Sequence, residues 1–152
     1  MDNKNIAINS SDINVNNTIW NDIKEGKDIL LITGFSSVEF LISKISTINF
    51  KKTNSVRFLL GNEFNETDTI YRIEKRMLQY WQEKSFSYRN IQKVKKLYKL
   101  ILNNKVKIKL DKKQHSKIYL NENFASVGSS NFSYSGFHFQ KETNTLISPS
   151  ED

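Results

Sequence analysis

The sequence predicts an α/β domain in which helices flank a mixed β-sheet. In the first two thirds of the chain, short apolar runs that end at glycine alternate with helical patterns. In the last third, short strand patterns follow one another. Such an order is typical of a sheet with helices packed on it, so we expect an α/β sandwich. The 152 residues fit one domain and leave little room for a second.

The first predicted elements follow a polar N-terminus. Residues 1–17 are rich in Asn and Ser, and we expect them to be loosely ordered ahead of a single folded domain over 18–152. The apolar run from Ile29 to Gly34 predicts a buried strand. Ser36 or Ser37 then caps a helix that continues through Ile45. Residues 56–61 repeat the pattern of an apolar run ending at glycine and predict a second strand.

Two longer helices are expected in the middle of the chain. One begins near Asp68, and the other runs from about Tyr88 to Asn103, each with apolar residues at helical spacing. The second carries four lysines that we expect to form a solvated face and not a binding patch: Lys93, Lys95, Lys96 and Lys99. Trp20 and Trp81 are expected in the core.

The last third of the sequence predicts four strands. Val106, Ile108 and Leu110 alternate with lysines, which is strand periodicity. Residues 115–120, 124–127 and 143–147 predict three further short strands. We find no internal repeat and no linker, and Pro149 is placed where a strand can stop.

Composition excludes several classes of function. There is no cysteine, so disulfides, thiolate chemistry and cysteine-based zinc sites are excluded. With two histidines, a histidine-rich metal site is not expected. No apolar run reaches about 18 residues and the N-terminus does not resemble a secretory signal, so we expect a cytoplasmic protein without a membrane segment. The net charge of +7 favours polyanionic partners, nucleic acid being the commonest.

The chemistry is expected between residues 115 and 142. On a strand, His115, Lys117 and Tyr119 would share one face, so that an imidazole and an ammonium project side by side. A tight turn at Gly128-Ser129 follows, and Asn131 lies just beyond it. Gly128 permits close backbone approach, while the Ser and Asn side chains supply hydrogen bonds. Together these groups suit a phosphate.

This pattern, His-x-Lys followed by Gly-Ser-x-Asn, resembles the signature of the phospholipase D superfamily, whose nuclease members carry one copy per chain. The family commonly has an Asp five residues after the Lys, where this chain has Glu122, to which we assign a structural role. Glu142 matches the acidic residue that follows the Asn in the family. His138 matches no motif position and is interpreted as a structural or rim histidine.

The resemblance implies a metal-independent phosphodiesterase without a cofactor, whose site forms between two copies of the motif. With one motif per chain, the site would form across a homodimer two-fold. One His115 would attack phosphorus to form a phosphohistidine, and the partner copy would act as general acid and base. Glu142 would orient His115. Lys117, Ser129 and Asn131 would bind and stabilise the phosphoryl oxygens, with Gly128 allowing their approach.

The substrate is left open between three hypotheses. We favour a DNA nuclease, since the chain is basic and carries one motif. The alternative is a nucleic-acid-binding and dimerisation module with weak or lost chemistry, and the third is a phospholipid hydrolase. The stretch 127–136 also resembles versions of the domain attached to helicases and restriction enzymes. The chain is therefore expected to be the N-terminal piece of a longer protein with helicase or specificity domains, in a defence or restriction setting.

Overall fold

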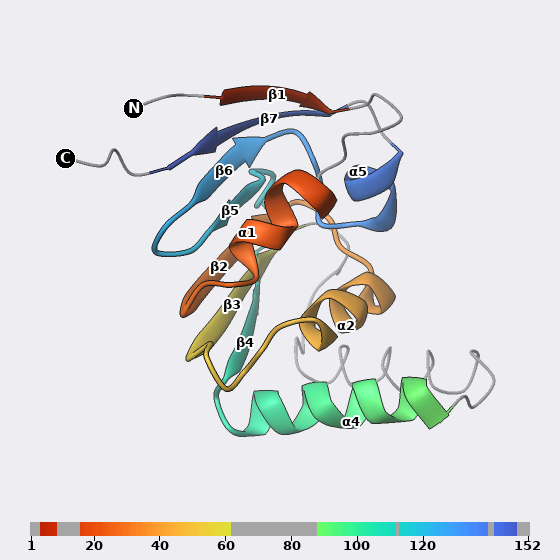
Figure 1. Cartoon of the computed structure of the whole chain (residues 1–152). Helices are drawn as coiled ribbons and strands as arrows, with labels where there is room; N and C mark the ends of the chain where they lie inside the picture. Colours follow the sequence, from red (N-terminus) through yellow and green to blue (C-terminus); the bar gives the residue numbers. More distant parts are fainter. Residues whose placement is uncertain (1–3, 9–15, 62–87, 112, 140–141, 149–152) are drawn as a thin grey trace.

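The fold is built on one mixed sheet of seven strands. The computed structural model describes residues 4–8, 16–61, 88–111, 113–139 and 142–148. The strands are β1 (Lys4–Ile8), β2 (Asp28–Thr33), β3 (Ser55–Leu60), β4 (Val106–Leu110), β5 (Ile118–Leu120), β6 (Ala125–Gly128) and β7 (Glu142–Ile147). Their order in the sheet is β1-β7-β6-β5-β2-β3-β4 (Figure 1). The predicted α/β class with a mixed sheet is confirmed.

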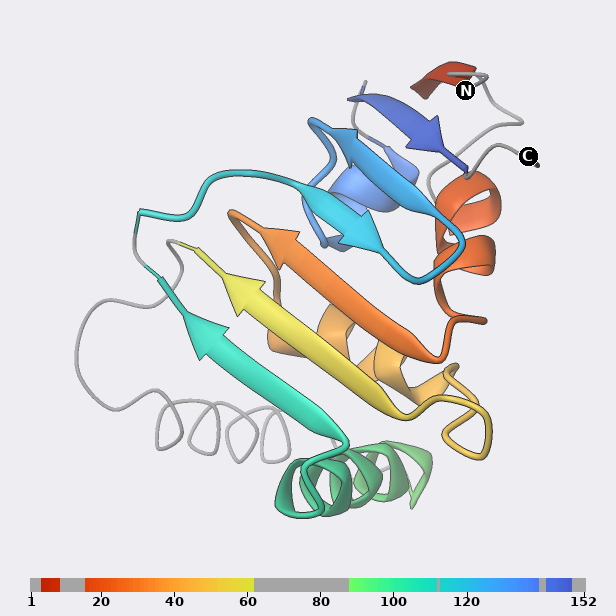
Figure 2. The ribbon, with the colours of Figure 1, turned by 90° about the vertical axis from the view of Figure 1, so that its left-hand side faces the viewer.

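The sheet has a parallel half and an antiparallel half. Strands β2, β3 and β4 pair in parallel, as expected for strands that are separated by helices. Strands β5, β6, β7 and β1 add to them through antiparallel pairs. Figure 2 shows the two halves side by side, with β5 next to β2 at their junction. This arrangement reflects the change in sequence character in the last third of the chain.

Two of the helices were predicted, and both begin and end close to the expected residues. Helix α2 spans Val38–Ser46, and Ser37 caps it by accepting a hydrogen bond from the backbone N–H of Phe40 at 3.3 Å. Helix α4 spans Tyr88–Leu102. The helix expected from Asp68 onward, together with Trp81, lies outside the described residues.

Three short helical segments were not predicted. A π-helical turn, Asn16–Trp20, leads into α1 (Asn21–Ile23), and α5 (Tyr134–His138) follows β6. The signal for the first two was present, because Ile19, Trp20 and Ile23 have helical spacing and are all buried. For α5 the signal was Ser133, which caps the helix by accepting a hydrogen bond from the N–H of Gly136 at 3.1 Å.

The N-terminus differs from the expectation of a loosely ordered tail. Residues Lys4–Ile8 form β1, which pairs with β7 over its whole length from Lys4 opposite Leu146 to Ile8 opposite Glu142. A β-strand needs only backbone groups to extend a sheet, so a polar sequence can supply one. The polarity of this segment therefore did not reveal it.

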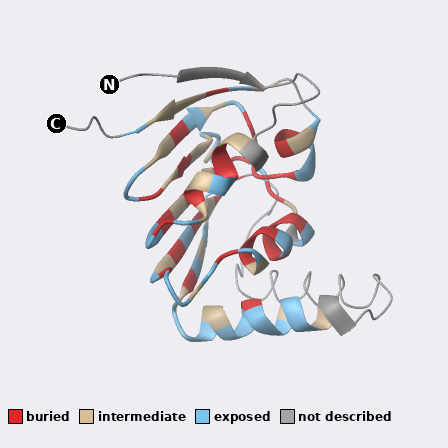
Figure 3. Ribbon diagram, in the orientation of Figure 1, coloured by how far each residue is buried: buried red, intermediate tan, exposed pale blue. Residues whose placement is uncertain are grey.

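An aromatic cluster forms the centre of the core. Phe132 is fully buried, with its ring 5.0 Å from that of Phe40, 5.3 Å from Phe137 and 5.7 Å from Phe58. Trp20 and Tyr119 complete the cluster, which confirms the core placement of Trp20. Helices α2 and α5 therefore pack on the same face of the sheet, where Figure 3 shows many of the buried positions.

Candidate active site

The predicted site residues gather at one edge of the sheet because several strands begin or end there. Ile32, next to the last residue of β2, pairs with Ile118, the first residue of β5. Ile118 in turn pairs with Val127, near the end of β6. The carboxyl ends of β2 and β6 thus lie beside the start of β5, and ligands of open α/β sheets bind at such an edge. Figure 2 shows the segment that leads into β5 running along the ends of β3 and β2.

His115 lies in this segment, exposed and directly against Gly34. A Cβ on Gly34 would be 3.0 Å from Nδ1 and 3.4 Å from Cα of His115. A Cβ on Gly61 would lie 2.7 Å from the carbonyl oxygen of Gly34 and would also clash with the backbone of Gln114. The glycines that end the two predicted strands therefore make room for residues 114–115 to cross the strand ends.

The prediction that His115 and Lys117 lie on a strand is wrong. Strand β5 begins only at Ile118, and residues 114–117 approach it as an irregular segment. Strand β2 pairs with β5 only as far as Ile32, and the chain turns at Gly34. Residues 115–116, which precede β5, therefore have no β2 residue to pair with. Tyr119 does not share a face with the site, because its side chain is buried in the core.

Lys117 nevertheless remains close to His115. Its side chain folds back so that Nζ donates a hydrogen bond to the His115 carbonyl oxygen at 2.6 Å. Lys117 is half-buried, whereas His115 is exposed. A local hydrogen bond to the backbone of His115, and not strand alternation, therefore holds the Lys117 ammonium beside this residue.

Ser129 and Glu142 are in direct contact across the ends of β6 and β7. The Ser129 hydroxyl donates a short hydrogen bond to Oε2 of Glu142 and accepts one from the backbone N–H of Thr143 at 3.0 Å. Glu142 and His115, both described, share no hydrogen bond with each other. The structure thus connects Glu142 to the site through Ser129.

The residue between Ser129 and Asn131 is fixed on both sides. Ser130 is fully buried, its carbonyl oxygen accepts a short hydrogen bond from the Tyr119 hydroxyl, and its own hydroxyl accepts one from Nδ2 of Asn144 at 2.6 Å. Burial raises the pKa of Tyr119, a hydrogen bond with Thr33 opposes that shift, and the charge of Glu142 adds to it. The phenol therefore stays protonated and keeps its hydrogen bond across the physiological range.

Asn131 is held at the end of β2. Its side-chain oxygen lies 3.4 Å from the hydroxyl of Thr33, which is buried and also accepts a hydrogen bond from the N–H of Phe132 at 3.0 Å. The backbone of Asn131 packs on Gly136 of α5, where a Cβ would approach the Asn131 nitrogen to 2.9 Å. Gly128 performs a similar role at the end of β6, where β7 approaches closely.

Glu122 has the structural contact expected of it. Its carboxylate accepts hydrogen bonds from the N–H of Lys27 at 2.8 and 2.9 Å and from the N–H of Asp28 at 3.3 Å, at the start of β2. These hydrogen bonds lower the pKa of Glu122, and the bonds from the Lys27 backbone have the largest effect. Glu122 lies beyond the end of β5, whereas His115 lies before its start, so Glu122 is remote from the site edge.

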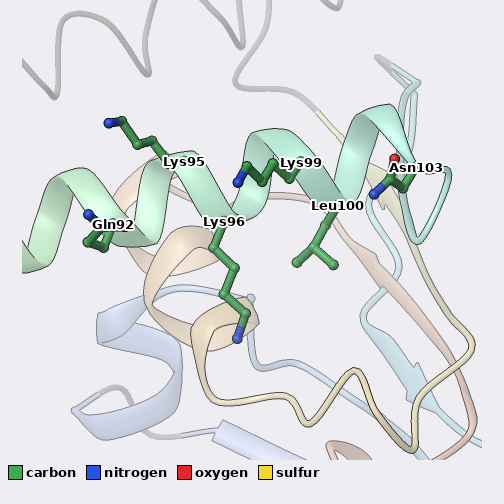
Figure 4. A pocket seen from close by; sticks show the side chains of 6 residues that line it. All are labelled: Gln92, Lys95, Lys96, Lys99, Leu100 and Asn103. Atoms are coloured by element: carbon green, nitrogen blue, oxygen red, sulfur yellow. The ribbon is translucent and has the colours of Figure 1, made fainter.

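The positive charge on α4 lies elsewhere. Lys93, Lys95, Lys96 and Lys99 are exposed, as predicted. A shallow pocket of about 320 Å³ is lined by three of them and by Gln92, Leu100 and Asn103 (Figure 4). Lys96 reaches toward α2, where Nζ lies 3.4 Å from the Ser46 carbonyl oxygen. The C-terminal end of α4 leads into the start of β4, at the opposite end of the strands from His115, so this pocket is not part of the site.

The comparison with protein families decides the assignment. The model described as "Cardiolipin synthase, PLD-like domain" matches residues 19–151. The chain belongs to this phospholipase D-like family. The predicted superfamily is therefore confirmed, and with it an enzyme of the class that hydrolyses phosphodiester bonds. A comparison with curated protein sequences finds no significant match.

Solved structures share the fold of this phospholipase D-like domain at low sequence identity. NucT from Helicobacter pylori superposes with a TM-score of 0.60 and 13% identity over 98% of this chain and 86% of its own. Phosphatidylserine synthase from Haemophilus influenzae gives 0.64 and 14%, over 98% of this chain and 35% of its own. Yeast tyrosyl-DNA phosphodiesterase gives 0.54 and 13%, over 95% and 31%.

Two further features of the phospholipase D-like domain concern partners. Within the described residues, no helix is long and apolar enough to cross a bilayer. The same residues contain no group of three or more His, Cys, Asp or Glu side chains arranged to hold a metal ion.

His138, interpreted from the sequence as a structural or rim histidine, lies on α5 beside Tyr134. The two ring centroids are 4.7 Å apart, and His138 is half-buried.

Proposed function

We propose that this domain is a nuclease that cleaves DNA phosphodiester bonds through a covalent intermediate on His115, without a metal ion. One observation carries the proposal. His115 and Lys117 are joined by a hydrogen bond at the sheet edge where Ser129, Asn131 and Glu142 also lie. This edge offers a nucleophile, a cation and neutral hydrogen-bonding groups, which together suit an attack on a phosphodiester.

His115 would supply the nucleophile. Its Nδ1 faces Gly34, so we assign Nε2 to the attack. A nitrogen–phosphorus bond forms as the phosphorus–oxygen bond to the leaving strand breaks, and a proton is delivered to that oxygen. Water then attacks the phosphohistidine, gives up a proton, and restores the free imidazole and a phosphate end.

Lys117, Asn131 and Ser129 would stabilise the phosphoryl oxygens during both steps. The Lys117 ammonium can exchange its bond to the His115 carbonyl for a phosphate oxygen with a small movement. In other phosphoryl-transfer enzymes Mg²⁺ often provides this neutralisation. Glu142 would orient the catalytic side chains. Before substrate binds, we expect it to act through the hydrogen bond that it accepts from the Ser129 hydroxyl.

A second copy of the chain would supply the general acid and base. With one motif per chain, a two-fold contact that brings two site edges together gives one His115 for attack and another for proton transfer. The attacking copy would act as the neutral imidazole, and the other copy would carry the proton that the leaving oxygen receives.

The charge of the chain supports nucleic acid as the substrate. Two copies carry twice the net charge of +7, which favours binding to a phosphate backbone without base readout. The likeness to phosphatidylserine synthase and the description of the family model favour a second candidate, hydrolysis of a phospholipid headgroup. Both reactions would use the same attack by His115.

The test is cleavage of DNA in excess chelator, with single-stranded DNA and duplex plasmid as parallel substrates. We expect the parent protein and a Lys113→Ala control to cut, because Lys113 is an exposed lysine in the same loop. His115→Ala and Lys117→Ala should not cut. Restoration of a chelated enzyme by a divalent ion would refute the metal-independent mechanism. Headgroup release from vesicles with no action on DNA would select the phospholipid candidate, and DNA binding without cleavage by any form would indicate a binding module.

A further inference from the structure

Helix α5 carries an exposed aromatic patch on its outer side. The patch consists of Tyr134, His138 and Phe139, of which Tyr134 is 60% exposed and Phe139 is 68% exposed. The Tyr134 ring lies 4.7 Å from that of His138 and 5.3 Å from that of Phe139. Large rings are usually withdrawn from water, so a cluster of exposed rings indicates a surface that receives a ligand.

Helix α5, which carries most of the aromatic patch, is held beside Asn131 of the candidate active site. Gly136 of the same helix packs on the backbone of Asn131, and Ser133 caps the helix. Phe137 points the other way and is buried against Phe132, with ring centroids 5.3 Å apart. Only Phe132 and Ser133 separate Asn131 from Tyr134, and both are buried.

We propose that the aromatic patch stacks unpaired bases next to the phosphate at His115, so that the substrate is single-stranded nucleic acid. Bases within a duplex already stack on one another, whereas unpaired bases are free to stack on aromatic side chains. This inference rests on the proposed function and adds the class of substrate to it.

The protonation state of His138 is consistent with this role. Burial lowers the pKa of His138, and the nearby charge of Lys44 lowers it further. At neutral pH the imidazole is therefore uncharged and presents an aromatic ring between its neighbours. Tyr134, two residues after the Ser36–Phe132 bridge, lies on the side of the domain where β2 ends.

Nucleobases fit the aromatic patch better than a lipid surface. A helix that lies in a membrane interface needs a long apolar face, whereas α5 has five residues, of which Gly136 and Phe137 face the core. The exposed residues of the patch are all rings. The positive charge of the chain provides the sequence-independent attraction to the backbone that accompanies base stacking on single strands.

The test compares binding of two fluorescent oligonucleotides of equal length, one with bases and one abasic, so that only stacking differs. Binding is measured in the His115→Ala background, which prevents cleavage. We expect the base-bearing strand to bind about tenfold more tightly. Tyr134→Ala with Phe139→Ala should abolish that ratio and leave the affinity for the abasic strand unchanged. Tyr98→Ala is the matched control, because Tyr98 is 46% exposed but lies on α4.

Three results would overturn the inference: equal affinity for both strands, a ratio that persists in the double variant, or a double variant that loses binding to phosphatidylglycerol vesicles but not to oligonucleotides. Tyr134→Phe, which keeps the ring, should retain the ratio. Cleavage by the parent protein is scored separately. DNA cleavage without base-dependent binding removes only the stacking role, whereas base-dependent binding without cleavage removes the nuclease function and supports the patch as a stacking surface.

Discussion

At the scale of single residues, the site depends on the absence of a side chain at two glycines as much as on the side chains expected to act in catalysis. Gly34 and Gly61 allow the segment that carries His115 to pass directly over the ends of two strands. The sequence showed two apolar runs ending at glycine, but it did not show what would lie against those glycines. That information depends on the tertiary path of residues 113–117, which local pattern cannot supply.

A methyl group at Gly34 should disturb His115 selectively. In Gly34→Ala the new Cβ would lie 3.0 Å from Nδ1 of an exposed imidazole that can move, so we expect at least a tenfold loss of phosphodiesterase activity with a nearly unchanged melting temperature. Gly61→Ala is the contrasting variant, because its Cβ would meet backbone atoms that cannot yield, and it should lower the melting temperature. Full activity in Gly34→Ala would show that the position of His115 is not critical.

Lys44 is a buried cation whose protonation should affect stability. Its Nζ lies 5.0 Å from the ring centroid of Phe40, 5.1 Å from that of Phe137 and 5.8 Å from that of Trp20. Burial lowers the pKa of Lys44 from 10.5 to about 8, with a further contribution from the charge of Lys24. The folded protein therefore releases this proton at a lower pH than the unfolded chain does.

The sign of the pH dependence follows from that difference. Between about pH 8 and 10.5 the unfolded chain holds more protons at Lys44, so its contribution to the free energy of unfolding rises with pH across this window. We expect Lys44→Met to be more stable than the parent at pH 7 by about 1 kcal/mol, allowing for screening by water. The advantage should shrink by pH 10 in urea titrations. A constant difference across this range would contradict the lowered pKa.

At the scale of elements, α5 shows how a short helix positions both the motif and the aromatic patch. Its sequence is too short and too mixed to give a clear helical period, and only the Ser133 cap indicated it. The strands and helices with strong periodicity, such as β2, β3, β4, α2 and α4, were predicted with nearly correct ends. The short helical segments, Asn16–Trp20, α1 and α5, depend on contacts with distant parts of the chain, and the sequence alone did not place them.

Removal of the α5 cap should weaken both stability and activity. Ser133→Ala leaves the N–H of Gly136 without its partner, so the free energy of unfolding should fall by about 1 kcal/mol. Because Gly136 packs on Asn131, catalysis should fall as well. Ser135→Ala in the same helix is the control, since Ser135 is exposed and its side chain does not cap the helix. Equal stability of the two variants would show that the cap is not important.

At the scale of the whole molecule, the phospholipase D-like fold was predictable from two short motifs, whereas the details of the site were not. Histidine, lysine, serine, asparagine and glutamate occur at the family spacing, and the structure gathers their segments at one sheet edge. The strand assigned to His115 and Lys117 was wrong, and the bond between Ser129 and Glu142 was not foreseen. Spacing fixes which segments meet, but it does not fix which side-chain atoms pair.

A site shared between two copies predicts a particular response to mixing. Parent protein is mixed with increasing amounts of the His115→Ala variant and left until the dimers have exchanged subunits. Cleavage is then measured at constant total protein. If each site needs His115 from both copies, activity should fall with the square of the parent fraction, because only parent–parent dimers are active. A linear fall would indicate a site complete within one chain. Analytical ultracentrifugation of the same mixtures confirms that exchange has occurred.

The central claim is that His115 forms a covalent bond to phosphorus, and rapid acid-free quenching of a cleavage reaction tests it most directly. A substrate labelled at the scissile phosphate is mixed with the parent protein in chelator, denatured in alkali, and the protein is examined for label. We predict a labelled adduct that is stable in alkali, lost in acid, located on His115 by mass spectrometry, and missing from His115→Ala. Cleavage by the parent protein with no labelled adduct, or with the label on another residue, would contradict the account.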